Sequence, residues 1–212
     1  MLPKAAQPST PKQEKRALRQ QVLGHRDHLS AGQRREASAR ILERLLGHPA
    51  FQHARGVHAF ISFPEEVDTA PILEACARAG KAVFIPYQVR EERRLGAAPW
   101  QPGTPLIPGP FGCLEPPLEA RTLVDPSRID LVLVPGVAFD RHGHRLGYGM
   151  GYYDGFLATL GAAHGVASGR SSAIALAFAC QIVPRVPVES WDVIIPTILT
   201  EDEEIIAEPL AP

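Results

Sequence analysis

The chain has 212 residues, of which 45% are hydrophobic and 21% are charged, a balance typical of a globular rather than a disordered protein. Its 22 Lys and Arg nearly match its 23 Asp and Glu, so a formal net charge of −1 gives no electrostatic reason to expect binding to nucleic acid or a membrane surface. We expect a disordered tail over residues 1–11, which is rich in proline, and one domain over residues 12–212.

The cysteines and the N-terminal residues bear on the cellular compartment. Cys76, Cys113 and Cys180 lie far apart and form no CxxC pair, which fits reduced thiols. The N-terminal residues lack the apolar stretch of a signal peptide, and no apolar run reaches the ~18 residues of a transmembrane helix. The sequence therefore predicts a soluble, cytoplasmic protein, which we expect to be a monomer.

The first part of the chain predicts two helices. A helical pattern begins at Lys12, in which Leu18, Val22, His25 and Leu29 recur at steps of four, three and four residues. Ser30 and Gln33 then form a capping-box pattern, which predicts the start of a second helix that runs to about Leu46.

The rest of the chain alternates strand-like and helix-like segments. We expect strands at residues 56–62, 81–86, 130–139, 173–178 and 193–199, helices at residues 71–79 and 152–160, and short strands and turns within residues 87–128. The segment 130–139 is nearly all apolar, which is typical of a parallel strand buried on both faces. This order predicts an α/β fold: a three-layer domain with a mostly parallel, Rossmann-like sheet and helices on both faces.

The strongest candidate for a binding site is the loop between the apolar strand and the helix at residues 152–160. Ligands of open α/β sheets bind at the carboxyl ends of the strands, where this loop begins. Its alternating Gly147, Gly149 and Gly151 allow backbone N–H groups to converge on an anion, beside the partial positive charge of a helix N-terminus. The spacing matches neither a Walker A loop nor the Rossmann fingerprint, so a tight turn that packs the helix on the sheet is the alternative.

Basic side chains on the first predicted helix form a second candidate. Lys12, Lys15, Arg16 and Arg19 fall on one face, where like charges repel one another unless a bound polyphosphate relieves the repulsion. A solvated charged face is the simpler alternative. Arg145, in the glycine-rich loop, can offer a fork of donors to a phosphate.

Three carboxylates form a third candidate. Asp154 lies in the first turn of the helix after the glycines, and Asp192 precedes the last predicted strand. Magnesium usually takes one or two protein carboxylates together with phosphates and waters, so either residue suits such a site. Glu66 follows the first predicted strand, at a carboxyl end. Each of the three could instead be a helix cap or a surface charge.

Several motifs in the same order resemble those of the 5-formyltetrahydrofolate cyclo-ligase family, also called 5,10-methenyltetrahydrofolate synthetase. The most specific is Val134–Asp140 followed by Gly143–Asp154. The other matching segments are Lys15–Arg19, Glu66–Thr69, Phe111–Pro116, Ala175–Phe178 with Gln181, and Val186–Val188 ahead of Asp192. The resemblance covers most of the chain.

The resemblance implies an activity and a set of site residues. The family cyclises 5-formyltetrahydrofolate to 5,10-methenyltetrahydrofolate, using ATP and Mg²⁺ and releasing ADP and phosphate. By resemblance, the ATP-binding residues would be Lys15, Arg16, Arg19, Arg145, Leu146, Gly147, Tyr148, Gly149, Met150, Gly151, Tyr152 and Tyr153. The folate-binding residues would be Ile61, Glu66, Tyr148, Gly149, Met150, Gly151 and Tyr152. Arg145 and Tyr152 would be catalytic, and Asp154 and Asp192 would bind the metal.

Three residues depart from the family pattern. Met150 stands where relatives commonly carry glycine or lysine, and Gly155 stands where an arginine often follows. Pro196 falls inside the last predicted strand, where it would remove a ladder donor. Two other functions remain open: a non-catalytic folate- or nucleotide-binding relative, and a phosphate-binding isomerase or transferase on a similar sheet.

Overall fold

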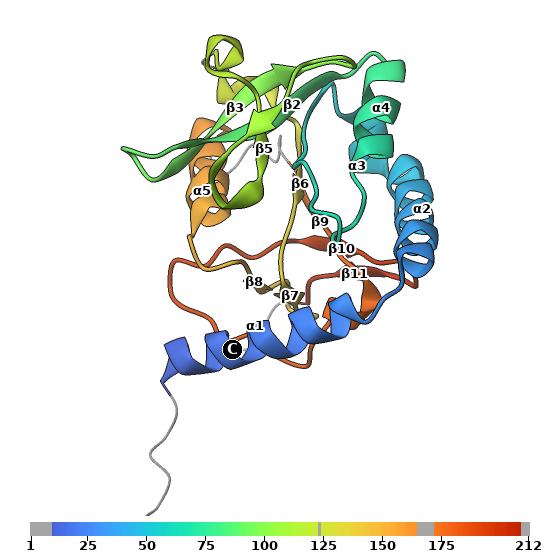
Figure 1. Ribbon diagram of the computed structural model, residues 1–212, viewed down its shortest axis with the longest axis vertical. Helices are drawn as coiled ribbons and strands as arrows, with labels where there is room; N and C mark the ends of the chain where they lie inside the picture. Colours follow the sequence, from blue (N-terminus) through green and yellow to red (C-terminus); the bar gives the residue numbers. More distant parts are fainter. Residues whose placement is uncertain (1–9, 123, 165–171, 209–212) are drawn as a thin grey trace, which may run out of the picture.

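The computed structural model describes residues 10–122, 124–164 and 172–208, and a seven-stranded sheet lies at its centre (Figure 1). The strands of this sheet are β1 (Gly56–His58), β2 (Ala82–Val89), β3 (Arg94–Trp100), β6 (Leu131–Val134), β9 (Ser172–Leu176), β10 (Thr197–Leu199) and β11 (Glu204–Ile206). Their spatial order is β11-β10-β9-β6-β1-β2-β3. The five inner strands are parallel, and β3 and β11 pair antiparallel at the two edges.

The helices and smaller elements complete the fold. The α-helices are α1 (Pro11–Asp27), α2 (Ala31–Gly47), α3 (Pro49–His53), α4 (Ala70–Arg78) and α5 (Tyr152–His164). Two short antiparallel pairs join β4 (Ile107–Pro108) to β5 (Leu114–Glu115) and β7 (Ala138–Phe139) to β8 (Arg145–Leu146). Single 3₁₀ turns occur at η1 (Pro110–Gly112), η2 (Leu118–Ala120), η3 (Pro126–Arg128) and η4 (Ala179–Gln181).

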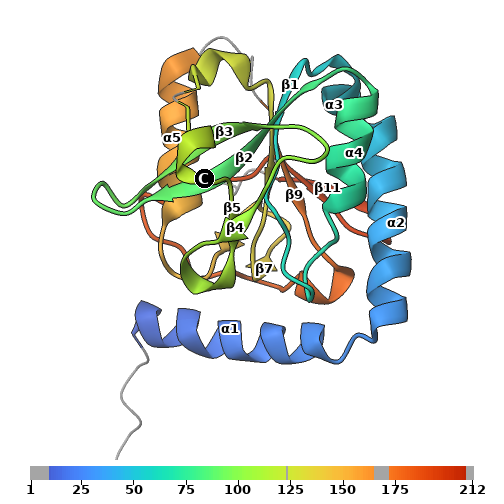
Figure 2. The same cartoon turned by 45° about the horizontal axis from the view of Figure 1, so that its top comes forward.

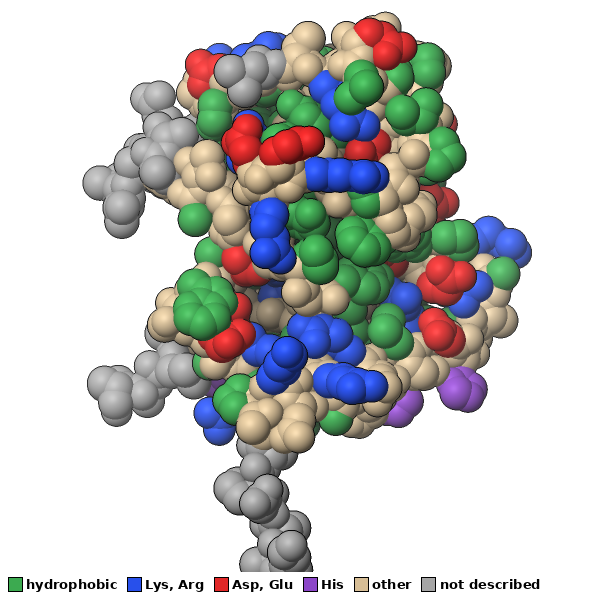
Figure 3. Space-filling view, turned by 60° about the vertical axis from the view of Figure 1, so that its left-hand side comes forward, with side chains coloured by type: hydrophobic (Ala, Val, Ile, Leu, Met, Phe, Trp, Pro, Cys, Tyr) green, Lys and Arg blue, Asp and Glu red, His purple; other side chains and the backbone are tan. Residues whose placement is uncertain are grey.

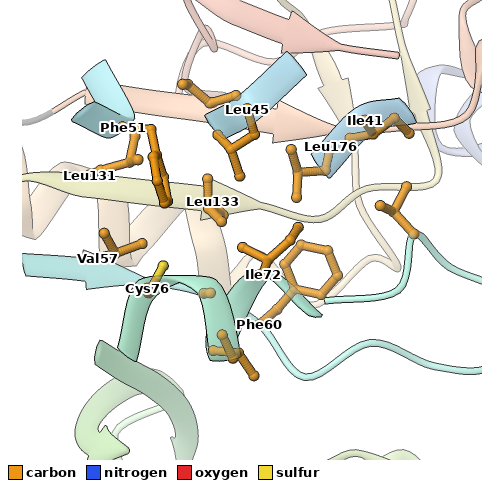
Figure 4. Close-up of a cluster of buried hydrophobic side chains, with 14 of the residues drawn as sticks. Ile41, Leu45, Phe51, Val57, Phe60, Ile72, Cys76, Leu131, Leu133 and Leu176 are labelled. Carbon is orange, nitrogen blue, oxygen red and sulfur yellow. The ribbon is translucent and has the colours of Figure 1, made fainter. Parts of the chain in front are cut away.

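The side chains of β6 alternate between two apolar layers. Leu131 and Leu133 pack in the layer of α2, α3 and α4, together with Ile72 (Figure 4). Val132 and Val134 point the other way and pack in the layer of α5. A strand that is buried on both faces needs such a continuous apolar run. The predicted α/β class, with a mostly parallel sheet and helices on both faces, is therefore confirmed.

Helix α1 lies across the carboxyl ends of the parallel strands rather than on a face of the sheet (Figures 1 and 2). Its buried Val22 packs against Val137, Ala138, Leu146 and Val186, which belong to the segments that follow β6 and η4. This contact holds one face of α1 against the edge where ligands of such sheets bind.

The helix starts agree closely with their sequence signals. Ser30 caps α2 through the predicted capping box with Gln33. Thr10 caps α1 in the same way, and Pro11 is the first helical residue, a position that tolerates proline because its missing N–H has no helical partner. The predicted tail boundary after residue 11 was therefore wrong for Thr10 and Pro11. Residues 1–9 lie outside the described part of the chain.

Three predicted strands are much shorter in the structure, and a fourth, at residues 173–178, ends two residues earlier than predicted, as β9. The segment 130–139 divides into β6 and β7, because Pro135 lacks the N–H that would continue the parallel ladder. The segment 193–199 contributes only β10, so Pro196 precedes the strand and removes no ladder donor, contrary to our expectation. The segment 56–62 ends as a strand at His58, and Ser62 instead exchanges hydrogen bonds with Thr69 in the following turn.

Sequence periodicity missed α3, β8 and β11. We expected short strands within residues 87–128 without giving their bounds, and the longest strand there is β3, which pairs over all seven of its residues with β2. Its strand conformation follows from this pairing, because a weak local propensity gives way to a full ladder of backbone hydrogen bonds. The observed α4 agrees with the predicted helix within one residue at each end, and α5 extends four residues further than predicted.

Two expectations about the chain's environment can be compared with the described residues. All three cysteines are free thiols, as we expected. Across residues 10–122, 124–164 and 172–208, no helix is long and apolar enough to cross a membrane.

His58 is a buried polar side chain in the layer between β1 and α5. Its ring centroid lies 4.5 Å from that of Phe156 and 6.1 Å from that of Tyr153. Neither ring nitrogen has a hydrogen-bond partner within the described ranges. Burial lowers the pKa of His58 to about 3, so the ring is neutral at pH 7.

We expect His58 to make the protein acid-sensitive. The unfolded chain takes up a proton at this residue near pH 6.5, whereas the folded chain does not until about pH 3. Stability that is present above pH 6.5 is therefore lost as the pH falls toward 3, by up to about 1.4 kcal/mol per pH unit. The variant His58→Leu has no such group to protonate, so its stability should depend less on pH. The free energy of unfolding of the variant minus that of the unmodified protein should therefore increase as the pH falls from about 7 to about 4. Urea denaturation at several pH values measures this difference, and an advantage independent of pH would contradict the expectation.

Candidate active site

The glycine-rich loop, residues 147–151, connects β8 to α5 and contacts α1. The Nε of Arg19 donates a hydrogen bond of 2.8 Å to the carbonyl oxygen of Gly147. Gly149 has φ +105°, which favours glycine, and a Cβ there would lie in van der Waals contact with Nη2 of Arg19, at 3.5 Å. The loop and one cation of the predicted basic stripe are thus brought together.

The rest of the basic stripe does not act as one unit. Lys15 donates to the carboxylates of Glu189 and Asp192, with N–O distances of 2.7 and 2.9 Å. Partial burial alone would lower the pKa of Lys15, but these two hydrogen bonds raise it. Lys12 and Arg16 are exposed to solvent. Figure 3 shows Lys and Arg side chains gathered on the lower part of the molecule, where α1 lies.

Arg145 is the most buried cation of the predicted site. Its side chain is 5% exposed, and Nη2 lies 2.8 Å from Oδ2 of Asp154 in the first turn of α5. The guanidinium lies 5.9 Å from the ring centroid of Tyr153. Within the described ranges, Nε of Arg145 and the hydroxyl of Tyr153 are buried without partners. Two unpartnered donors in one place are costly, and a bound acceptor such as a phosphate would satisfy them.

The two predicted metal ligands, Asp154 and Asp192, lie on segments that contact each other. The backbone N–H of Val193, the residue after Asp192, donates a hydrogen bond of 3.3 Å to Oδ1 of Asp154. Both carboxylates already pair with cations, Asp154 with Arg145 and Asp192 with Lys15. No group of three or more His, Cys, Asp or Glu that could hold a metal occurs among the described residues. Two carboxylates still fit Mg²⁺, because this ion takes most of its ligands from phosphates and waters.

Glu66 lies in the loop between β1 and α4 and is 8% exposed. Its Oε1 accepts a hydrogen bond of 2.6 Å from the Tyr148 hydroxyl, and its Oε2 accepts one of 3.0 Å from the N–H of Phe63. Burial raises the pKa of Glu66, although these hydrogen bonds and the charge of Arg26 oppose the rise. Glu66, which we predicted to bind the folate, therefore lies beside the glycine-rich loop.

Arg26 is a site residue that our reading of the sequence missed. Its Nη1 donates to the Tyr148 hydroxyl over 3.0 Å and lies 4.0 Å from Oε1 of Glu66. Arg26, Tyr148 and four further residues line a cavity of about 390 Å³. Those four residues are Leu23, Asp27, Arg34 and Glu65. The signal was present, because Arg26 follows Arg19 by two helical turns and falls on the same face of α1.

The remaining predicted residues lie around this centre in different environments. Ile61 is partly buried against the core on the side of α2 and α4. Leu146 is buried in the apolar contact with α1, so only its backbone can face a ligand. Met150 is 44% exposed in the loop, and Tyr152 begins α5 and packs partly against the core on that side.

Comparison with known proteins gives a consistent result. The family model for the 5-formyltetrahydrofolate cyclo-ligase family matches residues 11–201. The chain is 32% identical over 180 residues to the 5-formyltetrahydrofolate cyclo-ligase of Escherichia coli K12, covering 84% of this chain and 96% of that one. It is 30% identical over 196 residues to the mouse 5-formyltetrahydrofolate cyclo-ligase, covering 89% and 94%.

A solved structure extends this similarity to the fold. The NMR structure of Aquifex aeolicus 5,10-methenyltetrahydrofolate synthetase superposes with a TM-score of 0.75 and 29% identity, over 93% of this chain and 95% of that one. The family model spans the basic helix, the glycine-rich loop and the segment that carries Asp192. The chain therefore belongs to the 5-formyltetrahydrofolate cyclo-ligase family.

Proposed function

We propose that this protein cyclises 5-formyltetrahydrofolate to 5,10-methenyltetrahydrofolate with ATP and Mg²⁺, releasing ADP and phosphate. The observation that carries the proposal is the position of the glycine-rich loop between two kinds of group. Arg19 holds the loop at Gly147, and the buried carboxylate of Glu66 holds it at Tyr148. An anion-binding loop thus adjoins a carboxylate that can accept hydrogen bonds from a pterin.

The chemistry explains why a phosphoryl donor is needed. The formyl oxygen of the substrate is amide-like and is a poor leaving group. Transfer of the γ-phosphoryl group to this oxygen releases ADP and creates a good leaving group. N10 of the folate then bonds to the formyl carbon and loses its proton, and the C–O bond breaks to release phosphate. The protein's contribution is mainly to position the reactants and to stabilise charge.

The basic residues of α1 and the glycine-rich loop are proposed to hold ATP. Lys15, Arg16 and Arg19 supply positive charge, and the loop over residues 145–153 supplies backbone N–H groups at the start of α5. Arg145 is proposed to stabilise the transferring phosphoryl group, because its unpartnered Nε is already desolvated. Tyr152 is the second proposed catalytic residue, at the first position of α5.

Asp154 and Asp192 are proposed to hold Mg²⁺ with the phosphates of ATP. A bound Mg²⁺ would neutralise part of the charge on these phosphates. Each carboxylate pairs with a cation, Arg145 or Lys15, that is itself proposed to contact the triphosphate. On binding of ATP, its phosphates would replace the carboxylates as partners of these cations, and the two carboxylates would then be able to hold Mg²⁺. Ile61, Glu66 and the loop are proposed to contact the folate.

An assay of turnover distinguishes the proposed enzyme from a non-catalytic relative. The protein is incubated with 5-formyltetrahydrofolate, ATP and Mg²⁺, and methenyl product and ADP are measured together. We expect the two products in equal amounts, and no turnover when Mg²⁺ is removed with a chelator. Binding of both ligands without product would instead support the non-catalytic alternative.

Arg19→Ala should weaken ATP binding. Its guanidinium lies at the loop proposed to hold the triphosphate, and a charge-assisted hydrogen bond contributes about 1.5–3 kcal/mol, so ATP affinity should fall roughly tenfold or more. Lys12→Ala is the matched control, because Lys12 is an exposed cation of the same helix. Calorimetric titration with ATP measures both variants. If the two variants lose the same affinity for ATP, the basic side chains of α1 act only through their general positive charge, and Arg19 has no specific role.

Glu66→Gln should weaken folate binding and leave ATP binding nearly unchanged. The amide replaces one carboxylate oxygen with a donor, so a pterin N–H would face an N–H. A buried unpaired donor costs about 1–3 kcal/mol, which corresponds to a loss of roughly five- to hundredfold in folate affinity.

Glu74→Gln serves as the control for this change, because Glu74 is an exposed carboxylate of α4 that pairs with Arg78. Separate titrations with 5-formyltetrahydrofolate and ATP give the two affinities. If Glu66→Gln weakens the binding of both ligands equally, Glu66 stabilises the fold and does not bind the pterin.

A further inference from the structure

The carboxylate proposed to read the pterin is already engaged in this structure. Oε1 of Glu66 accepts from the Tyr148 hydroxyl at 2.6 Å, and Oε2 accepts from the Phe63 N–H at 3.0 Å. Glu66 is buried, so little of its carboxylate is open to another donor. A ligand that donates N–H groups to this carboxylate must compete with the Tyr148 hydroxyl.

We propose that Tyr148 is a gate residue, whose hydroxyl occupies Glu66 in the free protein and must leave before a reduced pterin can bind there. This inference rests on the proposed function, because it takes 5-formyltetrahydrofolate as the ligand of Glu66. It also assigns the Tyr148 side chain a role different from that of its backbone in the glycine-rich loop.

Three contacts hold the gate in the closed position. The Tyr148 hydroxyl donates to Glu66 and accepts from Nη1 of Arg26 at 3.0 Å, so both its donor and its acceptor functions are used. The Phe63 ring meets the Tyr148 ring edge-on, with centroids 6.2 Å apart. Partial burial and the neighbouring Glu66 charge raise the pKa of Tyr148, so its hydroxyl keeps the proton that it donates.

The same residue is able to move. Tyr148 is 47% exposed and lies between Gly147 and Gly149, the second of which has φ +105°. Glycine visits left-handed and extended backbone regions at little cost, so the backbone on either side of Tyr148 can change its conformation with little intrinsic strain. The Tyr148 ring also borders the cavity of about 390 Å³ that Leu23 and Arg34 help to line. The ring can therefore leave Glu66 without any rearrangement of the sheet.

The gate makes an unusual prediction, which is that loss of a hydrogen bond improves binding. Tyr148→Phe keeps the ring and its contact with Phe63 but removes the hydroxyl that competes for Glu66. Since a hydrogen bond to a charged group is strong, its absence from the free protein should tighten 5-formyltetrahydrofolate binding about tenfold. A residue that merely supported the loop, or that bound the folate through its hydroxyl, would give the opposite change.

The test is a calorimetric titration with 5-formyltetrahydrofolate in the absence of ATP. Three proteins are compared: the unmodified chain, Tyr148→Phe, and the control Tyr87→Phe. Tyr87 lies on β2, and the guanidinium of Arg121 lies 5.2 Å from its ring centroid. Circular dichroism verifies that all three are folded. A dissociation constant about tenfold lower in Tyr148→Phe alone supports the gate.

Other outcomes separate the gate from the proposed function. Unchanged or weaker binding in Tyr148→Phe, with an unmodified protein that binds and converts 5-formyltetrahydrofolate, overturns the gate and leaves the function standing. A gain shared by Tyr87→Phe also overturns the gate, since the side-chain hydroxyl that donates to Glu66 is that of Tyr148. If neither the unmodified protein nor Tyr148→Phe binds 5-formyltetrahydrofolate, the proposed function and the gate fail together.

Discussion

The packing of α1 across the carboxyl ends of the parallel strands is the contact on which the candidate site depends. Val22 enters an apolar cluster with Val137, Leu146 and Val186, and this burial holds the helix at the edge of the sheet. Once α1 is held there, its cations reach two separate segments. Lys15 reaches the segment of Asp192, whereas Arg19 and Arg26 both reach the glycine-rich loop, at Gly147 and at Tyr148.

The charges of the site are arranged in pairs that a ligand can rearrange. Lys15 pairs with Glu189 and Asp192, and Arg145 pairs with Asp154. A buried charge without a partner is expensive, so these pairs lower the cost of keeping the cations partly desolvated before a ligand arrives. In the proposed function, the phosphates of ATP would replace the carboxylates as partners of the cations, and the two carboxylates would then be available to a metal ion.

Much of the fold could be read from local signals. The apolar run that contains β6 indicated a strand buried on both faces, and both apolar layers are present in the structure. Ser30 and Gln33 marked the start of α2, because a capping box depends only on residues three positions apart. The glycine-rich loop and the start of α5 were also predicted correctly, since both depend on backbone preferences of nearby residues.

The amino-acid sequence by itself therefore determined the order of the main elements, the position of the glycine-rich loop and the basic face of α1, because short-range periodicity and glycine placement decide them. Only the tertiary structure decided which side chains meet. Tyr148 and Glu66 are 82 positions apart, and Lys15 and Asp192 are 177 positions apart. No local preference encodes such pairs. They form because parallel strands all end at one edge of the sheet, where their loops converge beneath the same helix.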